Sequence, residues 1–416
     1  MQAPAEKEVH RVQNCRICES SRLLTFLQLG PTPAPNSFLE KDQLGDAEKF
    51  YPLDVCFCRE CGMVQLGHVV NPDVMFKNYV YIPSTSQTMR RHFAGLAKTA
   101  SRQCFLQKGD LVVDIGSNDG LLLKNFIPMG FKVLGVDPAE NLAKKATEEG
   151  VETVNALFTR KTAEAIAKKK GKAKLILGTN VFAHVPDLHD FLEGVKILLE
   201  EGGKFIVEFP YLADLLDKVE FDTIYQEHLS YFSLSPIVKL AEKHGLGVAD
   251  VERLPVHGGS LRVTMSPKDK AICQKAEELL ETEQKSGLFK EETYLNFGKK
   301  VDKIRHELVQ MIWGLKLKGK KIVGYGASAK GNVLLNYCRI GPETLDYIVD
   351  SISYKQGKFT PGMHIPIFSE NKLIEDRPDY ALILAWNFAD EIIKKQETYK
   401  TKGGKFILSI PEPKIL

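Results

Sequence analysis

The sequence has no strong excess of charge of either sign and no long apolar run. Its 56 lysines and arginines nearly balance its 53 aspartates and glutamates, which excludes the strong field that would gather a nucleic acid or an anionic membrane surface. No uncharged stretch approaches the length of a membrane-spanning helix, and the opening residues MQAPAEKEVHRVQ lack the apolar core of a secretion signal. We therefore expect a cytoplasmic protein that binds neither nucleic acid nor membrane, as a monomer or a homodimer.

Cysteine is also scarce, because eight residues in a chain of 416 are too few for a disulfide scaffold. Two C-x-x-C pairs, CRIC and CRECG, nevertheless offer four thiolates to one tetrahedral Zn²⁺, from Cys15, Cys18, Cys58 and Cys61. Cys56, beside the second pair, is either a competing ligand or an idle thiol. A site with four thiolates has no open position for substrate, so we predict a structural metal.

Strand and helix patterns divide the chain into three predicted domains. Residues 1–78 are rich in cysteine and proline and lack a helical period, which indicates a zinc-binding domain. Residues 79–267 alternate apolar strands with amphipathic helices and end in two strands joined by VHGGS, as in a parallel, doubly wound α/β domain. Residues 268–416 begin with charged helices and then repeat the α/β pattern, which predicts a helical linker and a Rossmann-like domain.

The run VVDIGSNDG is the predicted cofactor site. Asp114 ends a predicted strand, and Asp137 ends the next, where a carboxylate can accept both hydroxyls of an adenosine ribose. Asn118 and Asp119 stand where dinucleotide sites keep glycines for a pyrophosphate, and their polar side chains suit the ammonium of a methionine moiety. We therefore predict S-adenosylmethionine, bound by Asp114, Gly116, Asn118, Gly120, Asp137 and Asn180. The alternative is a glycine turn that serves packing alone.

Polar residues of the predicted acceptor site gather in runs that follow strands, at the edge where open α/β sheets bind ligands. GTNVFAHVPDLHDF, FDTIYQEHLSYFSLS and YVYIPSTSQ supply five candidate catalytic residues, Tyr79, His184, Tyr225, Glu227 and His228, and two candidate substrate contacts, Tyr81 and Ser84. In the C-terminal turn GYGASAKGN, Lys330 and Asn332 stand at a predicted helix start. There they could receive a diphosphate, or the turn could serve packing only.

In these runs the chain resembles the nucleotide-sugar C-methyltransferase family. The resemblance covers nearly the whole chain and rests on motifs in the family's order, among them PLDVCFCRECGMVQL, YVYIPSTSQTMRRH, SNDG, NVFAHVPDLHDF, FDTIYQEHLSYFSL, VHGGSLRV, GYGASAKGN and PGMHIPI. It implies a zinc-binding domain, a class I S-adenosylmethionine methyltransferase domain and a Rossmann-like C-terminal domain. It also implies methylation, usually at C-3, of a thymidine-diphosphate-linked 4-keto-6-deoxyhexose. Gln226 departs from the histidine that is common in the family's Y-H-E-H run.

The predicted chemistry begins with removal of a proton beside the sugar ketone. Histidine, with an unperturbed pKa of about 6.5, can be neutral at working pH, so His228 is the predicted base. Glu227 would orient or stabilise an imidazole, while Tyr79, Tyr225 and His184 would hold the sugar oxygens and the enolate. One rival is a nicotinamide-dependent nucleotide-sugar oxidoreductase that uses GYGASAKG as its dinucleotide turn and Asp350 for the ribose. Another is a non-catalytic zinc scaffold.

Overall fold

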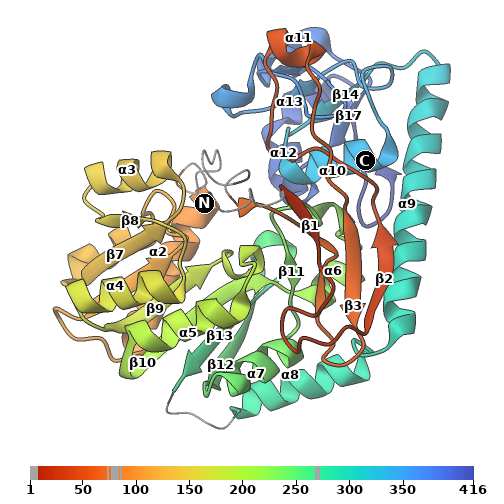
Figure 1. Ribbon diagram of the computed structural model, residues 1–416. Coiled ribbons are helices and arrows are strands. Elements are labelled where there is room, and N and C mark those ends of the chain that lie inside the picture. Colours follow the sequence, from red (N-terminus) through yellow and green to blue (C-terminus); the bar gives the residue numbers. More distant parts are fainter. Residues whose placement is uncertain (1–7, 73–74, 76–83, 85–86, 268–271) are drawn as a thin grey trace, which may run out of the picture.

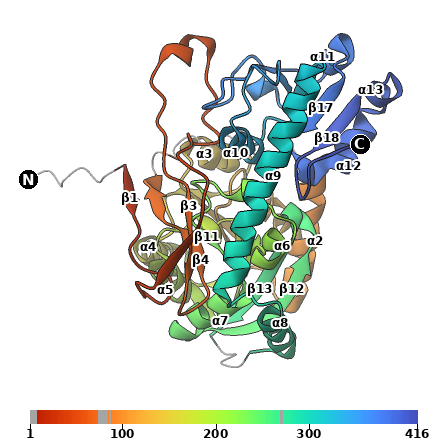
Figure 2. The ribbon, with the colours of Figure 1, turned by 90° about the vertical axis from the view of Figure 1, so that its right-hand side faces the viewer.

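The computed structural model of the chain describes residues 8–72, 75, 84, 87–267 and 272–416 (Figure 1). These residues form four β-sheets with helices around them. The long helix α9 (Glu291–Leu317) runs beside β2 and β3 and reaches the C-terminal lobe (Figures 1 and 2). Among the described residues, no helix is both long and apolar enough to span a bilayer.

The first two sheets are antiparallel and belong mainly to the N-terminal module (residues 8–72). The two-stranded sheet pairs β1 (Val9–Arg11) with β5 (His68–Val70). The four-stranded sheet has the order β11-β4-β3-β2, formed by β2 (Leu23–Gln28), β3 (Asp54–Cys58), β4 (Val64–Leu66) and β11 (Ser230–Tyr231). Because β11 comes from the middle of the chain, this sheet joins two parts of the protein that are distant in sequence.

The middle lobe (residues 87–267) contains a seven-stranded sheet in the order β12-β13-β10-β9-β6-β7-β8. Its strands are β6 (Leu111–Ile115), β7 (Lys132–Asp137), β8 (Thr153–Asn155), β9 (Ala173–Thr179), β10 (Leu199–Pro210), β12 (Gly247–Leu254) and β13 (Ser260–Ser266). The strands from β10 to β8 are parallel, whereas β13 runs antiparallel to both of its neighbours. This is the doubly wound sheet, with a closing hairpin, that the sequence predicts.

Helices cover both faces of this sheet. They are α2 (Gln87–Gln103), α3 (Glu140–Glu148), α4 (Arg160–Lys170), α5 (Leu188–Leu198) and α7 (Leu234–Lys243). The short helix α6 (Leu212–Asp217) instead packs into a cluster with residues of the N-terminal module. In the central strand β9, Ile176 packs into a cluster with residues of α4, α5 and α7, whereas Leu175 and Leu177 pack with residues of α2 and α3. Since both faces are covered, β9 is apolar at successive positions rather than alternating.

The C-terminal lobe (residues 322–416) contains a six-stranded sheet in the order β16-β15-β14-β17-β18-β19, parallel except for β19. Its strands are β14 (Ile322–Tyr325), β15 (Ile348–Val349), β16 (Ile367–Phe368), β17 (Tyr380–Ile383), β18 (Lys405–Leu408) and β19 (Lys414–Ile415). Its helices are α10 (Ala329–Cys338), α11 (Asn371–Asp376), α12 (Ala389–Lys395) and α13 (Glu397–Thr401). The lobe repeats the α/β architecture, as predicted.

The linker helices α8 (Gln274–Lys285) and α9 attach the lobes to the N-terminal module. Tyr294 of α9 stacks on Phe57 of β3, with ring centroids 4.3 Å apart. Gly298 allows α9 to approach β2, because a Cβ at this position would lie 2.8 Å from the carbonyl oxygen of Phe26. One hydrophobic cluster accordingly contains residues of all three parts, among them Leu53, Val55, Phe221, Ile224, Leu308 and Leu334.

Candidate active site and metal centre

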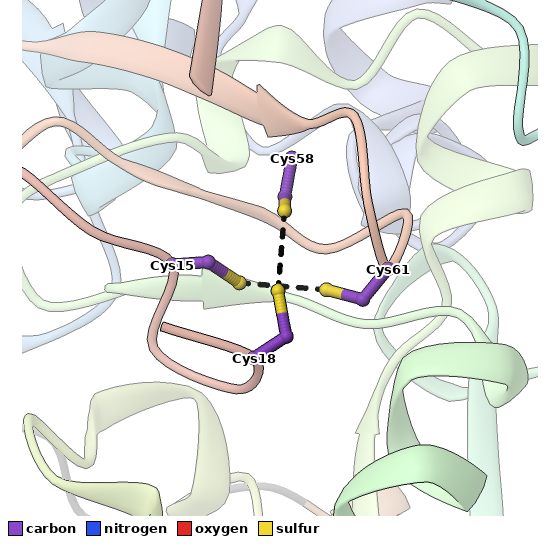
Figure 3. Close-up of side chains that lie close together, drawn as sticks. All are labelled: Cys15, Cys18, Cys58 and Cys61. Carbon is purple, nitrogen blue, oxygen red and sulfur yellow. Dashed lines mark hydrogen bonds between the residues drawn. The ribbon is translucent and has the colours of Figure 1, made fainter. Parts of the chain in front are cut away.

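Four cysteines of the N-terminal module converge on one point (Figure 3). Their Sγ atoms lie within 4.8 Å of one another, with 3.4 Å between Cys15 and Cys61 and 3.5 Å between Cys18 and Cys58. Zn–S bonds of about 2.3 Å in a tetrahedron require S–S distances of about 3.8 Å, so the donor set fits Zn²⁺. Cys56 lies outside this cluster, and its Sγ is 3.4 Å from Oγ1 of Thr25.

The glycines of the predicted cofactor turn have steric reasons to be glycine. Gly116 follows β6 with φ +70°, and a Cβ there would lie 2.9 Å from the side chain of Val181. Gly120 has φ +74°, and its Cβ would lie 3.0 Å from Val151. Both positions combine left-handed backbone with close packing, which only glycine tolerates without strain. These contacts explain the local sequence of the turn and leave ligand binding as a prediction.

Asp137 ties the turn to the next strand. One carboxylate oxygen accepts a hydrogen bond from the backbone N–H of Asn118 at 2.8 Å, and the other accepts one from Ala139 at 2.9 Å. Burial raises the pKa of Asp137, and the two N–H donors oppose that effect. Asn180 follows β9 with φ +57° and donates its backbone N–H to the carbonyl of Glu208 at 2.8 Å. The two predicted residues thus lie at the carboxyl ends of β7 and β9.

The same turn contains buried polar atoms without a hydrogen-bond partner among the described residues. They are Oδ1 of Asp114, Oγ of Ser117 and both carboxylate oxygens of Asp119. Burial raises the pKa of Asp114 well above its usual range, and the nearby charges of Asp137 and Glu208 add to the effect. Buried polar groups normally find partners, so this group of atoms is suited to a polar ligand. Ser117 is the contributor that the sequence does not predict.

A buried ion network lies on the neighbouring strand. Glu208 of β10 is 1 % exposed, and its carboxylate is 2.7 Å from Nε2 of His92 and accepts a hydrogen bond from Nε of Arg262 at 2.6 Å. Burial raises the pKa of Glu208, but His92 and Arg262 outweigh it and hold the pKa below its usual value. Neither partner is predicted as a site residue, because α2 and β13 meet β10 only in the folded chain.

Three predicted catalytic residues have rings that lie against one another. The ring of His184, in a 3-10 helix (Phe182–His184) that follows β9, lies 5.1 Å from that of His228 at 21°. The ring of Tyr225 lies 4.0 Å from that of His228 on the same turn, where the N–H of His228 donates to the carbonyl of Tyr225 at 2.9 Å. Burial lowers the pKa of His184 to about 4, so this imidazole is neutral at pH 7.

The tautomer of His228 follows from one contact. Its Nδ1 lies 2.8 Å from the carbonyl oxygen of Thr223, in a 3-10 helix (Phe221–Thr223). A carbonyl oxygen only accepts, so Nδ1 must carry the proton and donate it. In a neutral ring Nε2 then keeps its lone pair, which is the arrangement a general base requires.

Glu227 reaches a different partner, in the N-terminal module. It is 3 % exposed, and Oε1 accepts a hydrogen bond from Nδ2 of Asn36 at 2.8 Å. Gln226 beside it donates to Oγ1 of Thr32 at 2.7 Å. The sequence does not predict Asn36 as a site residue, because the loop PTPAPNSF meets the predicted catalytic run Tyr225–His228 only in the folded chain, where residues 191 positions apart are in contact.

The remaining predicted residues are not all described. Tyr79 and Tyr81 lie outside the described residues, and the carbonyl of Ser84 accepts a hydrogen bond from Nε of Arg90 at 2.8 Å. Asn332 donates from Nδ2 to the carbonyl of Pro35 at 2.6 Å.

Lys330 lies at the contact between the two lobes. Its buried Nζ lies 4.6 Å from the ring centre of Trp386 and has no hydrogen-bond partner among the described residues. Burial lowers the pKa of Lys330, while the carboxyl groups of Asp222 and Glu220 raise it. Burial also raises the pKa of Glu220 to about 7 and that of Asp222 to about 6. Nε1 of Trp386 donates to Asp222 at 2.7 Å.

Asp350, the acid that a nicotinamide site in the C-terminal turn would use, already has hydrogen-bond and ion-pair partners. Asp350 accepts hydrogen bonds from the backbone N–H groups of Ala327 and Ile352, each at 2.7 Å. Nζ of Lys355 lies 3.6 Å from the Asp350 carboxylate and donates to the carbonyl of Ala327 at 2.7 Å. The partly buried lysine offsets the charge of this acid, which makes Asp350 a poor partner for a nicotinamide ribose.

Three family models match successive parts of the chain. A zinc binding domain matches residues 15–76, a methyltransferase domain matches residues 88–251, and a C-methyltransferase C-terminal domain matches residues 255–411. Together with the observed sheets, these matches confirm the predicted fold class: a zinc-binding N-terminal module, a class I methyltransferase fold in the middle and a Rossmann-like C-terminal lobe.

Comparisons with individual proteins separate one relative from the rest. The C-methyltransferase NovU of Streptomyces niveus is 40% identical over 410 residues, which cover 98% of each chain. A ubiquinone biosynthesis O-methyltransferase of Chelativorans sp. (strain BNC1) is 32% identical over 101 residues, 24% of this chain and 40% of its own. The solved magnesium protoporphyrin IX methyltransferase of Synechocystis PCC 6803 is 14% identical, with a TM-score of 0.33, and covers 45% of this chain and 85% of its own. On the full-length match to NovU, the chain belongs to the C-methyltransferase family.

Proposed function

We propose that the protein transfers the methyl group of S-adenosylmethionine to C-3 of a nucleotide-diphosphate-linked 4-keto-6-deoxy sugar. The observation that carries this proposal is the hydrogen bond from Nδ1 of His228 to Thr223, which places the lone pair of the neutral ring on Nε2, as a general base requires. The ring of His228 lies against those of His184 and Tyr225. His184 and Asn180 lie in one segment that follows β9, so the proposed acceptor and cofactor sites are adjacent.

The cofactor proposal rests on the turn after β6 and on the end of β7. Asp137 would accept the ribose hydroxyls, since a carboxylate has lone pairs beyond the two that its backbone donors use. The unpartnered oxygens of Asp114 and Asp119 would receive the methionine ammonium. When bound, the cofactor would supply a methyl group on a positively charged sulfur, which is the electrophile that the reaction needs.

The acceptor chemistry assigns a task to each ring. Nε2 of His228 would take the proton from the carbon beside the ketone, and the electron pair of the broken C–H bond would form an enolate. Neutral His184, together with Tyr225 and the predicted Tyr79, would donate hydrogen bonds to sugar oxygens and to the enolate oxygen. Glu227 would stabilise the imidazolium that forms. The enolate carbon would then accept the methyl group, and the C–S bond would break.

The N-terminal module would hold a structural Zn²⁺ through Cys15, Cys18, Cys58 and Cys61, because four thiolates close the coordination sphere. For the substrate diphosphate we keep Lys330 and Asn332 as proposed contacts. Support comes from the Nζ of Lys330, which has no hydrogen-bond partner among the described residues and lies at the start of the ten-residue helix α10. The nicotinamide rival is less well supported, because Lys355 neutralises Asp350.

The test is mass spectrometry after incubation with S-adenosylmethionine and a panel of nucleotide-linked 4-keto sugars in deuterated water. We expect one added methyl group on carbon and solvent deuterium at C-3 before transfer. His228→Asn should lose the exchange, and matched sugars with a 4-hydroxyl group should not react. Methylation of oxygen or nitrogen, or reduction of a nicotinamide, would refute the proposal. Unimpaired exchange in His228→Asn would remove His228 as the base.

A further inference from the structure

The loop PTPAPNSF (residues 31–38) of the N-terminal module lies against the catalytic run of the middle lobe. Gln226 donates from Nε2 to the hydroxyl of Thr32 at 2.7 Å and to its carbonyl at 3.2 Å. Asn332 of α10 donates to the carbonyl of Pro35 at 2.6 Å. Both lobes therefore hold this loop through buried side-chain amides, on either side of the residues that lead to Asn36.

The composition of the loop favours a fixed conformation. Three of its residues are proline, whose ring fixes φ near −65° and reduces the freedom of the unfolded chain. Thr32 is buried and pairs with Tyr51 of the same module through two backbone hydrogen bonds, at 2.9 and 3.0 Å. Asn36 therefore projects from a loop that is restrained before it at Thr32 and Pro35 and after it by the backbone hydrogen bond from Leu39 to the carbonyl of Phe359 at 3.0 Å, so that its amide needs little ordering to reach a partner.

That partner is Glu227, whose Oε1 accepts from Nδ2 of Asn36 at 2.8 Å. An ionised carboxylate can only accept, so the amide must turn its NH₂ group toward it. Such a hydrogen bond stabilises the charged form of a buried carboxylate and restricts its rotamer. Glu227 is itself adjacent in the chain to His228, the proposed base.

We propose that Asn36 is a positioning residue of the methyl-transfer site, which holds the Glu227 carboxylate in place from the N-terminal module. This inference rests on the proposed function. It makes the zinc-binding part of the chain a contributor to the reaction as well as to folding. The loop that lies between the two cysteine pairs in the sequence then completes the acceptor site.

The experiment compares Asn36→Asp with Asn36→Ala in the full-length protein at pH 8. Aspartate keeps the shape of asparagine but removes the donor and adds a like charge, whereas alanine removes both shape and donor. We expect kcat to fall about tenfold to a hundredfold in both variants, the loss of a hydrogen bond to a charged group, with aspartate no better than alanine. KM for S-adenosylmethionine should not change. If Asn36 only fills space, aspartate would restore kcat, and the inference would be wrong.

A matched control comes from the same module. Gln28 donates from Nε2 to Asp54 at 3.4 Å, an exposed amide–carboxylate pair away from the catalytic run. Gln28→Ala should keep the kcat and zinc content of the unmodified protein. Equal losses in Gln28→Ala and Asn36→Ala would show a general effect on the module and overturn the inference.

The contact can also be tested without any substrate. Urea unfolding of Asn36→Ala, Glu227→Ala and the double variant should give midpoint shifts that are not additive, because each single change removes the same hydrogen bond. Additive shifts would overturn the inference. If the unmodified protein methylates no ketone while the shifts are non-additive, the proposed function fails and the contact stands. If methylation occurs while both Asn36 variants keep full kcat, only the inference fails.

Discussion

The two α/β lobes share an architecture but differ in how their glycine turns are completed. In each lobe a strand leads through a glycine turn into a helical segment, and an acid ends the next strand, Asp137 in the middle lobe and Asp350 in the C-terminal lobe. Backbone N–H groups bind both acids. Of these two acids, Asp350 alone also faces a lysine among the described residues, the partly buried Lys355. A shared fold thus leaves one turn with polar atoms that have no partner in the described part of the chain, and it pairs the acid of the other turn with an internal cation.

The C-terminal lobe instead contacts residues next to those that hydrogen-bond to Glu227 and His228. Trp386 donates to Asp222, which precedes Thr223, whose carbonyl accepts from Nδ1 of His228. Asn332 donates to Pro35, which precedes Asn36, the donor to Glu227. The two contacts reach the proposed base and the proposed carboxylate separately. The C-terminal lobe thus reaches the proposed catalytic residues through side chains outside its sheet, while Lys355 pairs with the acid of its own glycine turn.

Removal of the metal should have the largest effect, because it should impair the predicted acceptor site while sparing the predicted cofactor site. The proposed cofactor contacts all lie in the middle lobe, whereas Glu227 accepts a hydrogen bond from a loop between the two cysteine pairs. We expect a chelator that strips Zn²⁺ to abolish methyl transfer and to leave S-adenosylmethionine binding measurable by calorimetry. If protein shown to be metal-free transferred methyl groups at the original rate, methyl transfer would not depend on the zinc-binding module and the prediction would be wrong.

Substituting Asp137 and Asp350 one at a time should show which of the two lobes binds S-adenosylmethionine. Asp137→Asn should weaken S-adenosylmethionine binding about a hundredfold, because hydrogen bonds from two ribose hydroxyls lose a charged acceptor. Asp350→Asn is the matched change in the C-terminal lobe and should leave this affinity unaltered. Calorimetry on both variants gives the measurement. Equal weakening in the two variants would remove the functional distinction between the turns.

The middle lobe should also lose stability in mild acid through His184. The pKa of this buried imidazole is about 4, below the ordinary 6.5, so the unfolded chain takes up a proton before the folded one. Its contribution to stability therefore falls as the pH drops from about 6.5 to about 4, by about 2 kcal/mol between pH 7 and pH 5. Urea unfolding should show a smaller loss in His184→Asn. If His184→Asn lost as much stability in acid as the unmodified protein, the acid sensitivity could not be assigned to His184.

The smallest effect is expected at the contact between the lobes. Trp386→Phe removes the donor to the buried carboxylate of Asp222 and should lower kcat about fivefold, the value of one hydrogen bond. Trp313, an exposed tryptophan of α9, gives the matched control, and Trp313→Phe should leave kcat unchanged. Steady-state kinetics of both variants decide the matter, and equal kcat values for the two would argue against support from the C-terminal lobe.

Local patterns predicted the parts of the site that local sequence determines. The strands that contain Asp114 and Asp137, the two C-x-x-C pairs and the turn containing Tyr225 and His228 all depend on residues near one another in the chain. Asn36 and Pro35 could not be predicted, because their partners lie 191 and 297 positions away. The ion pair between Asp350 and Lys355 could not be predicted either, since it forms only when the chain after β15 folds back over the turn.

The pairing of β11 with β4 has a consequence for how such enzymes are made and recombined. Strand β4 lies within the first hundred residues, yet its outer neighbour, Ser230–Tyr231, is translated much later. During translation, the N-terminal module therefore exposes the unpaired edge of β4 until β11 has been made, and exposed strand edges favour aggregation. A chimera that exchanges only the residues before the middle lobe would separate β4 from its native partner. Exchanging residues 230–231 together with the module avoids that mismatch.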